Sequence, residues 1–326
     1  MKKLVAEVKK ILPKEESGEE YPVLKKKGFK PVMVSKENFH EIKEPKGKKK
    51  ICFIDGGNAE LLGSNNFSIQ IIRIGAVCYQ NNKKLWTDKK DFYVIVKADG
   101  KSFEAKTLPE KYELKFELGD ESLKEGRSTV RISKVADYIR RIAELDFARK
   151  KSEESDIVVL DGSLEEKFDQ EKKYLKKLYA LSENKIVAGV SKTNSLLTDK
   201  GHSLSMVLSG MKKGSWNYNP VAKIDSDNLK ADIWFARLHE KSEYIFRVDV
   251  AGNAEELLSE LKRNSRDPVF LGYPYGLIDV DRLARISNQE KEYLRTRLMV
   301  ELGDDWKELK KYQNSLNAHS ILDNIR

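Results

Sequence analysis

Residues 157–163 read Ile157-Val158-Val159-Leu160-Asp161-Gly162-Ser163. Its four consecutive aliphatic residues predict a short strand that is buried on both faces. Asp161 follows at the end of this strand, and Gly162 allows the backbone to turn immediately. Open α/β sheets bind their ligands at the carboxyl ends of their strands. The stretch therefore places an acidic side chain where such a sheet carries its functional site.

A second stretch of the same design lies upstream and reads Ile51-Cys52-Phe53-Ile54-Asp55-Gly56-Gly57. If the two strands are neighbours in one sheet, Asp55 and Asp161 lie close together. Paired carboxylates supply the oxygen ligands that hold hard divalent cations. Each Asp-Gly pair taken alone is more typical of a turn or a cap. The prediction of a metal site therefore depends on the repetition of the pattern.

The composition indicates a folded, basic protein. The chain has 326 residues, 40% of them hydrophobic, so it can bury a large core as one domain or two. Its formal net charge of +9 favours a polyanionic partner such as nucleic acid. Charged residues make up 35% of the chain, which is typical of the surface ion-pair networks of thermophilic proteins.

Cys52 and Cys78 lie in apolar stretches and form no CxxC pair, which predicts buried thiols in an intracellular protein. No apolar run approaches the length of about 18 residues that a membrane span needs. The N-terminus also lacks the apolar centre of a signal peptide. We therefore expect a cytoplasmic protein that does not contact a membrane.

Residues 1–50 are expected to hold an N-terminal helix over residues 2–12 and a basic lead-in that ends in Lys46-Gly47-Lys48-Lys49-Lys50. Residues 51–326 are expected to form the main domain, with irregular insertions at about 99–127 and 198–230.

The order of the predicted elements indicates the fold class. Strands over residues 51–57, 67–79 and 85–98 follow one another through short turns such as Asn81-Asn82, as in an antiparallel meander. A helix capped by Ser128 runs to about Lys150 and leads to the Asp161 strand. Helices then alternate with buried strands, as at 164–181 and 185–190, which implies a parallel part of the sheet. Antiparallel strands followed by parallel strands, flanked by helices, form the mixed α/β sheet of the ribonuclease H-like fold, in which Asp55 and Asp161 are neighbours.

The remainder of the chain is expected to contain strands over residues 233–238, 244–250 and 269–271, a helix over 254–263, and mostly helix from 286 to 326. Asp249 and Asp279 lie near strand ends in this interpretation, and either could complete a site with Asp55 and Asp161.

Glu144 lies on the predicted crossover helix. Helical periodicity places it on the polar face with Asp137 and Arg140 and predicts a solvated side chain.

Several of these motifs, in this order, resemble the NurA nuclease family. They are Phe53-Ile54-Asp55-Gly56-Gly57, Ala143-Glu144-Leu145 followed by Leu160-Asp161-Gly162-Ser163-Leu164, Val190-Ser191-Lys192-Thr193, and Leu271-Gly272-Tyr273-Pro274-Tyr275-Gly276-Leu277-Ile278-Asp279. The resemblance spans about residue 50 to about residue 285, and the shared order and spacing make it specific although each Asp-Gly turn alone is a weak motif.

The resemblance implies a ribonuclease H-like fold and a manganese-dependent nuclease that degrades DNA from 5′ ends and cuts single strands. It also implies a homodimer that works with HerA, a hexameric ATPase, in DNA end resection during recombinational repair in archaea.

The family's catalytic positions fall on Asp55, Glu144 and Asp161, and its Ser-Lys motif falls on Lys192. Asp279 occupies the place of an acidic residue of the Gly-Tyr-Pro motif. Asp281 stands where many members have histidine, so this chain departs from the family there.

Phosphodiester hydrolysis needs a positioned water and neutralisation of charge on the phosphorane, which two cations about 3.5–4 Å apart supply. Asp55, Glu144 and Asp161 offer oxygen ligands that suit Mn²⁺ or Mg²⁺ rather than zinc, and Asp279 is a further candidate ligand. Lys192 is the expected point charge for a phosphate oxygen. Without the motif it would read as an ordinary surface lysine.

Tyr273 and Tyr275 are candidates for stacking on the bases of a single strand, although aromatic residues beside Gly and Pro more often pack within a turn. Arg282 is a weaker candidate for phosphate binding. Among the histidines, His319 is a remote candidate for the active site.

The chain has no GxxxxGK[ST] motif, so we expect a separate ATPase to drive processive work on duplex ends.

Two other functions are compatible with the same residues. A catalytically silent module of this fold would grip DNA or load a partner without cleaving. An RNA-directed nuclease would use the same acidic residues, because nothing in the sequence indicates how a 2′-hydroxyl is recognised.

Overall fold

The computed structural model describes residues 1–11, 19–24, 27–109, 111–124, 132–193, 195–227 and 229–314. The predicted cap Ser128 and the candidate His319 lie outside these residues. Contacts divide the chain into two compact units. Unit 1 comprises Met1–Lys46, Gly162–Leu164 and Ala188–Pro274, and unit 2 comprises Gly47–Asp161, Glu165–Val187 and Tyr275–Arg326.

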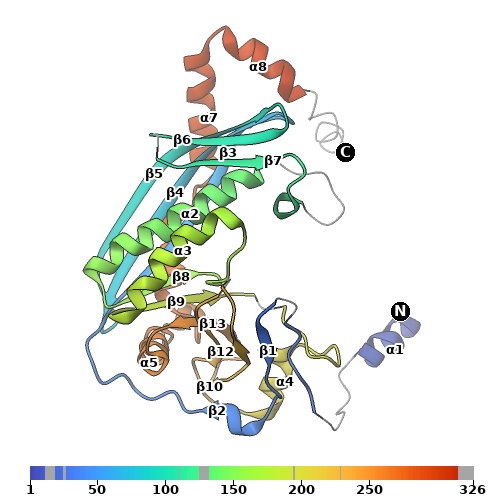
Figure 1. Cartoon of the computed structure of the whole chain (residues 1–326), viewed down its shortest axis with the longest axis vertical. Coiled ribbons are helices and arrows are strands. Elements are labelled where there is room, and N and C mark those ends of the chain that lie inside the picture. Colours follow the sequence, from blue (N-terminus) through green and yellow to red (C-terminus); the bar gives the residue numbers. More distant parts are fainter. Residues whose placement is uncertain are drawn as a thin grey trace. The chain divides into compact units, whose positions relative to one another are not determined.

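The sheet of unit 2 runs in the order β8-β3-β4-β5-β6-β7. Its strands are β3 (Lys50–Gly63), β4 (Phe67–Gln80), β5 (Lys83–Asp99), β6 (Ser102–Leu108), β7 (Glu113–Glu117) and β8 (Ile157–Asp161). The long strands β3, β4 and β5 pair antiparallel (Figure 1), whereas β3 and β8 pair parallel with Ile54 opposite Leu160. The expected mixed sheet is therefore confirmed, and the strands that carry Asp55 and Asp161 are neighbours.

Apolar burial and turn geometry explain these pairings. The aliphatic residues of β8 from Ile157 to Leu160 are fully buried, as a strand covered on both faces requires. Asn81 and Asn82 have φ angles of 52° and 60°, the left-handed backbone that a two-residue hairpin turn needs. Cys52 and Cys78 are buried free thiols and face each other across β3 and β4, as predicted for their burial.

The segment 99–127 was expected to be an irregular insertion, and the structure shows otherwise. It extends the sheet through β6 and β7. Phe103 and Ala105 alternate with more exposed residues along β6, and Leu114 and Phe116 do so along β7, so each strand buries one face. The many charged residues between these positions obscured the alternation.

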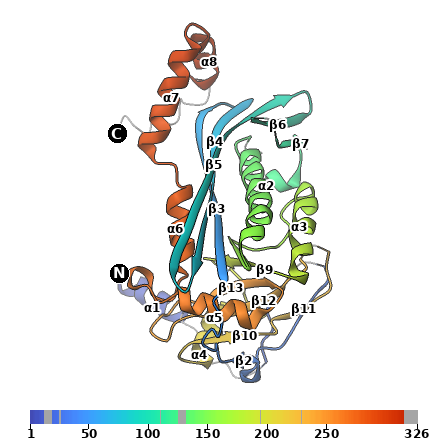
Figure 2. The ribbon, with the colours of Figure 1, turned by 90° about the vertical axis from the view of Figure 1, so that its left-hand side faces the viewer.

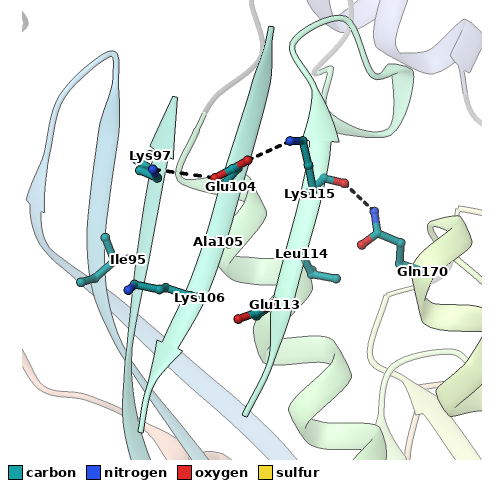
Figure 3. A pocket seen from close by; sticks show the side chains of 9 residues that line it. All are labelled: Ile95, Lys97, Glu104, Ala105, Lys106, Glu113, Leu114, Lys115 and Gln170. Carbon is teal, nitrogen blue, oxygen red and sulfur yellow. Dashed lines mark hydrogen bonds and ion pairs between the residues drawn. The ribbon is translucent and has the colours of Figure 1, made fainter. Parts of the chain in front are cut away.

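Figure 3 shows the charged surface of these outer strands around a hollow of about 480 Å³. Glu104 on β6 lies 2.8 Å from Lys115 on β7 and 3.8 Å from Lys97 on β5. These three residues are register partners, so the ion pairs link adjacent strands. Charged residues also alternate with buried apolar ones along β7, the edge strand of this sheet, and charged side chains on an edge strand discourage pairing with another strand.

Helices cover both faces of the unit 2 sheet (Figure 2): α2 (Lys134–Lys151) with α3 (Lys172–Tyr179) on one side, and α6 (Tyr275–Ala284) on the other. The chain continues through α7 (Asn288–Leu302) and α8 (Asp305–Asn314). The helix expected over 164–181 is shorter, because short 3₁₀ turns, η4 (Asp169–Glu171) and η5 (Ala180–Glu183), flank α3. Other 3₁₀ turns of unit 2 are η2 (Glu121–Leu123) and η3 (Ser152–Glu154).

Unit 1 has its own strands in the order β2-β10-β12-β13, with residues 188–191 of β9 beyond. Their bounds are β2 (Phe39–His40), β9 (Ile186–Ser191), β10 (Trp216–Tyr218), β12 (Asp232–Arg237) and β13 (Phe246–Ala251). A separate pair joins β1 (Phe29–Pro31) to β11 (Ala222–Ile224). The helical elements are α1 (Lys2–Ile11), α4 (Leu204–Met211), α5 (Ala254–Asn264), η1 (Lys36–Asn38) and η6 (Pro268–Phe270).

Two expectations about unit 1 were wrong. The lead-in is part of the core, because Phe39 pairs with Tyr218 through β2 and β10 and Ile42 is buried. Residues 269–271 form no strand, since Asp267 accepts from the backbone N–H of Val269 and Pro268 lacks the N–H that a sheet ladder uses. Among the described residues, no helix is both long and apolar enough to span a membrane.

Arg73 on β4 links α7 to the unit 2 sheet through ion pairs. Its side chain is 9% exposed and donates to both oxygens of Asp91 on β5, at 2.8 and 2.7 Å. It also donates to both oxygens of Glu290 on α7, at 3.1 and 2.6 Å. Hydrogen bonds from Arg73 lower the pKa of Asp91 below its ordinary range. Such bidentate, charge-assisted bonds are stronger than neutral ones.

We expect Arg73→Met to lower the free energy of unfolding by about 1–3 kcal/mol, because two charge-assisted contacts are lost while both carboxylates can reach water. Since Arg73 lowers the pKa of Asp91, its stabilising effect is present above the ordinary aspartate pKa and declines as the pH falls through the lowered value. Calorimetric melting at neutral and acidic pH measures both effects. Arg297→Met is the control, because Arg297 is 64% exposed in its pair with Glu301. Equal losses in the two variants would contradict the prediction.

Candidate active site

Asp55 lies half-buried within β3, where its Oδ1 accepts a hydrogen bond from the backbone N–H of Gly56 at 2.8 Å. Asp161 ends β8, the parallel neighbour of β3. Because Ile54 pairs with Leu160, the next residues, Asp55 and Asp161, occupy equivalent positions and face the same side of the sheet. The structure thus brings together the two aspartates that the sequence singled out.

The two glycines after Asp55 allow helices to approach β3 from both faces. A Cβ atom at Gly56 would lie 2.6 Å from Oε1 of Glu144 on α2. A Cβ atom at Gly57 would lie 2.3 Å from the carbonyl oxygen of Ala284 on α6. Successive residues of a strand face opposite sides. Asp55 and Gly57 therefore face α6, whereas Gly56 faces α2.

Asp281 completes a group of three carboxylates. One oxygen each from Asp55, Asp161 and Asp281 lies within 4.8 Å of the others. Asp281 is exposed and shares a face of α6 with Leu277 and Ala284, which are both buried. The packing of this face against β3 carries Asp281 to the two strand aspartates.

Asp279, the ligand expected from the sequence, is not a member of this group. It accepts a hydrogen bond from the hydroxyl of Tyr79 at 2.7 Å and lies 2.5 Å from Nζ of Lys84. Residues two apart on an α-helix are rotated by about 200°, so Asp279 and Asp281 point in different directions. Asp279 was placed near a strand end, and its true position on α6 moves it away from the carboxylate group.

Glu144 is buried, with 8% of its side chain exposed, so the predicted solvated position on α2 was wrong. Its Oε1 lies 3.7 Å from Nη1 of Arg140, and its Oε2 lies 3.9 Å from Nη1 of Arg141. Burial raises the pKa of Glu144, and the charges of the two arginines oppose this rise. The charge of Asp161 raises the pKa further. Glu144 is not in the three-carboxylate group, yet it is close enough for its charge to interact with Asp161.

Arg140 connects α2 to the glycine pair, because its Nη1 donates to the carbonyl oxygen of Gly56 at 2.6 Å. Burial alone would lower the pKa of Arg140. The negative charge of Glu144, with smaller contributions from Asp137, Asp55 and Asp161, outweighs that effect and raises the pKa. Arg140 thus partly compensates the concentration of negative charge.

The residues expected to contact nucleic acid are distributed over both units. Lys192 is exposed directly after β9 in unit 1. In unit 2, Arg282 is exposed on α6 beside Asp281. Tyr275 is half-buried at the start of α6, with its ring 6.5 Å from that of Tyr79 in an edge-on contact.

Tyr273 is 5% exposed and its ring lies 5.1 Å from that of Phe246, so it packs within unit 1 and does not present a face for a base. Asp249, the other acidic candidate near a strand end, is fully buried in unit 1. It accepts hydrogen bonds from Arg247 at 2.7 Å and from the backbone N–H of Leu164 at 2.9 Å.

Sequence reasoning did not assign Asp281, Arg140 or Arg141 to the site. A signal for Asp281 was present, because Leu277, Asp281 and Ala284 have the i, i+4, i+7 spacing of one helix face. No comparable signal marked the two arginines, since charged residues on a helix usually face solvent.

The crystal structure of the NurA nuclease from Sulfolobus solfataricus matches with a TM-score of 0.53 and 16% identity, over 82% of this chain and 88% of that one. Ciona intestinalis endonuclease V, in complex with a 24mer DNA containing an inosine followed by a ribo-adenosine, matches with a TM-score of 0.41 and 13% identity, over 74% and 87% of the chains. The catalytic domain of human endonuclease V gives 0.39 and 12%, over 78% and 85%. No curated protein matches the chain.

At these identities the likeness to solved structures concerns the fold. The family assignment comes from the sequence, because the model of the NurA domain matches residues 49–286. That range includes Asp55, Glu144, Asp161 and Asp281, the acidic residues that converge in unit 2. The chain belongs to the NurA family.

Proposed function

We propose that this chain is a DNA nuclease that hydrolyses phosphodiester bonds with the help of divalent cations. The observation that carries the proposal is the convergence of Asp55, Asp161 and Asp281 on one face of the unit 2 sheet. Membership of the NurA family supports it, and so does the description of the Sulfolobus relative as a nuclease.

The residues of this group fit a hard divalent cation. Carboxylate oxygens are the ligands that Mg²⁺ and Mn²⁺ prefer, and the described group contains neither cysteine nor histidine. Oxygens within 4.8 Å of one another can approach a common cation, since such ions hold their ligands at about 2.0–2.6 Å. The carboxylates of Asp55 and Asp161 are half-buried and that of Asp281 is exposed, so a substrate can reach the group.

A bound divalent cation would polarise the scissile phosphate and neutralise the charge that develops on it. Asp55, Asp161 and Asp281 would hold the cation, and Glu144 would add a ligand from the α2 side. Together these four carboxylates offer enough oxygen ligands for the two divalent cations that we expect from the sequence. Lys192 would contact a non-bridging phosphate oxygen. Arg282, which is exposed beside Asp281, would contact the neighbouring phosphate backbone of the DNA.

For the substrate and partners we propose what the family resemblance implies. The chain would degrade DNA from 5′ ends, cut single strands, form a homodimer, and act with a HerA ATPase in end resection. The absence of a GxxxxGK[ST] motif from the sequence supports the need for a separate motor. The net charge of +9 supports a polyanionic substrate.

We expect Asp55→Asn to abolish cleavage of an end-labelled DNA strand in Mn²⁺ while the protein still binds the strand. The amide is nearly isosteric with the carboxylate but carries no charge for a cation, so folding should be retained. Removal of divalent ions with EDTA should stop the parent protein in the same way, and added Mn²⁺ should restore it. Undiminished cleavage by Asp55→Asn would contradict the assignment.

The same assay separates the alternatives. Binding without cleavage by the parent protein in any of Mn²⁺, Mg²⁺ or Ca²⁺ would favour the silent binding module. Faster digestion of a labelled RNA than of a DNA of the same sequence would favour the RNA-directed nuclease.

We expect Asp281→Asn to lower the cleavage rate by about 100-fold or more. Mutation of a residue that only supports a metal ligand already lowers metal affinity or activity by about 10–100-fold. Asp279→Asn is the matched control on the same helix. It should lower the melting temperature slightly by weakening the contacts with Tyr79 and Lys84, with a change in rate of less than about 10-fold. A larger loss of cleavage in Asp279→Asn than in Asp281→Asn would reverse our assignment.

A further inference from the structure

Two arginines lie near the carboxylate of Glu144, beyond hydrogen-bond distance from its oxygens. The contacts to Arg140 and Arg141 are 3.7 and 3.9 Å. Both exceed the length of a normal hydrogen bond, although they are short enough for the positive charges to attract the buried carboxylate of Glu144. The arginines therefore compensate the charge of Glu144 and leave lone pairs of its carboxylate for another ligand.

Glu171, at the end of η4, fixes the orientation of Arg141. Glu171 is fully buried, and the side chain of Arg141 is 5% exposed. Nε of Arg141 donates to Oε1 of Glu171 at 2.8 Å. The other oxygen, Oε2, accepts from the backbone N–H of Lys167 at 2.9 Å. With both oxygens of Glu171 engaged, the guanidinium of Arg141 is held with Nη1 directed to Glu144.

A purely structural role explains this arrangement poorly. Removing an arginine and a glutamate from water carries a large desolvation penalty, and apolar residues of similar volume often stabilise a protein as well or better. The Arg141–Glu171 pair joins α2 to η4, where apolar packing would serve. What apolar residues would not supply is a fixed positive charge beside the buried Glu144.

We propose that Arg141 and Glu171 are positioning residues, with Glu171 orienting Arg141 and Arg141 holding the Glu144 carboxylate in place for a divalent cation. This inference rests on the proposed function, in which Glu144 is a ligand of that cation. It concerns residues that do not themselves touch the cation or the DNA.

The test is a double-mutant cycle that measures Mn²⁺ binding to the full chain by titration calorimetry, without DNA. Glu171→Gln should weaken Mn²⁺ binding by about 10–100-fold in the parent protein, as residues that support metal ligands do. In a Glu144→Gln background the same change should have no further effect, because its target is gone. Asp91→Asn is the control for loss of an arginine–carboxylate pair, since Asp91 pairs with a different arginine, Arg73, which also binds Glu290. It should lower the melting temperature and leave Mn²⁺ binding unchanged.

A second variant guards against misfolding caused by an unpaired buried arginine. In the double substitution Arg141→Gln with Glu171→Gln, neither charge remains, so the pair stays neutral and can still form hydrogen bonds. This variant should also bind Mn²⁺ 10–100-fold more weakly, by the same reasoning.

The outcomes separate this inference from the proposed function. Weaker Mn²⁺ binding in Glu144→Gln but parental binding in both Glu171 variants would overturn the positioning role alone. The positioning role would also be overturned if Glu171→Gln lost the same affinity with and without Glu144. Parental binding in Glu144→Gln would overturn Glu144 as a ligand and the positioning role with it.

Discussion

The close approach of two helices to the backbone of β3 is the constraint on which the candidate site depends. At Gly56 the side chain of Glu144 on α2 occupies the space of a missing Cβ, and at Gly57 the end of α6 does the same from the other face. Any larger residue at either position would overlap these atoms and push a helix away. The glycines therefore determine how near Glu144 and Asp281 can come to Asp55. Three parts of unit 2 that are far apart in the sequence meet because this short segment of strand has no side chains.

The approach concentrates negative charge, and the structure compensates it unequally on the two sides of β3. On the α2 side, Glu144 lies between Arg140 and Arg141, and Glu171 fixes the second arginine. On the α6 side, Asp55, Asp161 and Asp281 bring like charges within 4.8 Å, where repulsion favours a bound cation. Such a site favours binding of a divalent cation, and the bound cation would in turn attract a phosphate, in agreement with the proposed nuclease chemistry.

The sequence predictions were correct where interactions between neighbouring residues determine the structure, and wrong where contacts between distant segments do. Local patterns were sufficient for the strands of Asp55 and Asp161 and for the turn at Asn81 and Asn82. Periodicity failed at Glu144 because Gly56 of β3 has no side chain and lets α2 approach closely, so a polar residue of the helix is buried against the strand. The sequence favoured Asp279 over Asp281 as the neighbour of the strand aspartates because the segment was not recognised as a helix.

The amino-acid sequence alone was sufficient to show that two buried strands each place an aspartate before a glycine turn, and its motifs indicated the family. Burial patterns and turn residues act over a few neighbouring positions, so they can be recognised without the fold. The choice of the acidic residue of α6 that joins the strand aspartates, the burial of Glu144 between arginines, and the inclusion of the lead-in up to Lys46 in unit 1 became visible in the folded structure. These features depend on contacts between segments distant in the chain, where packing and charge compensation, rather than local preference, select the partners.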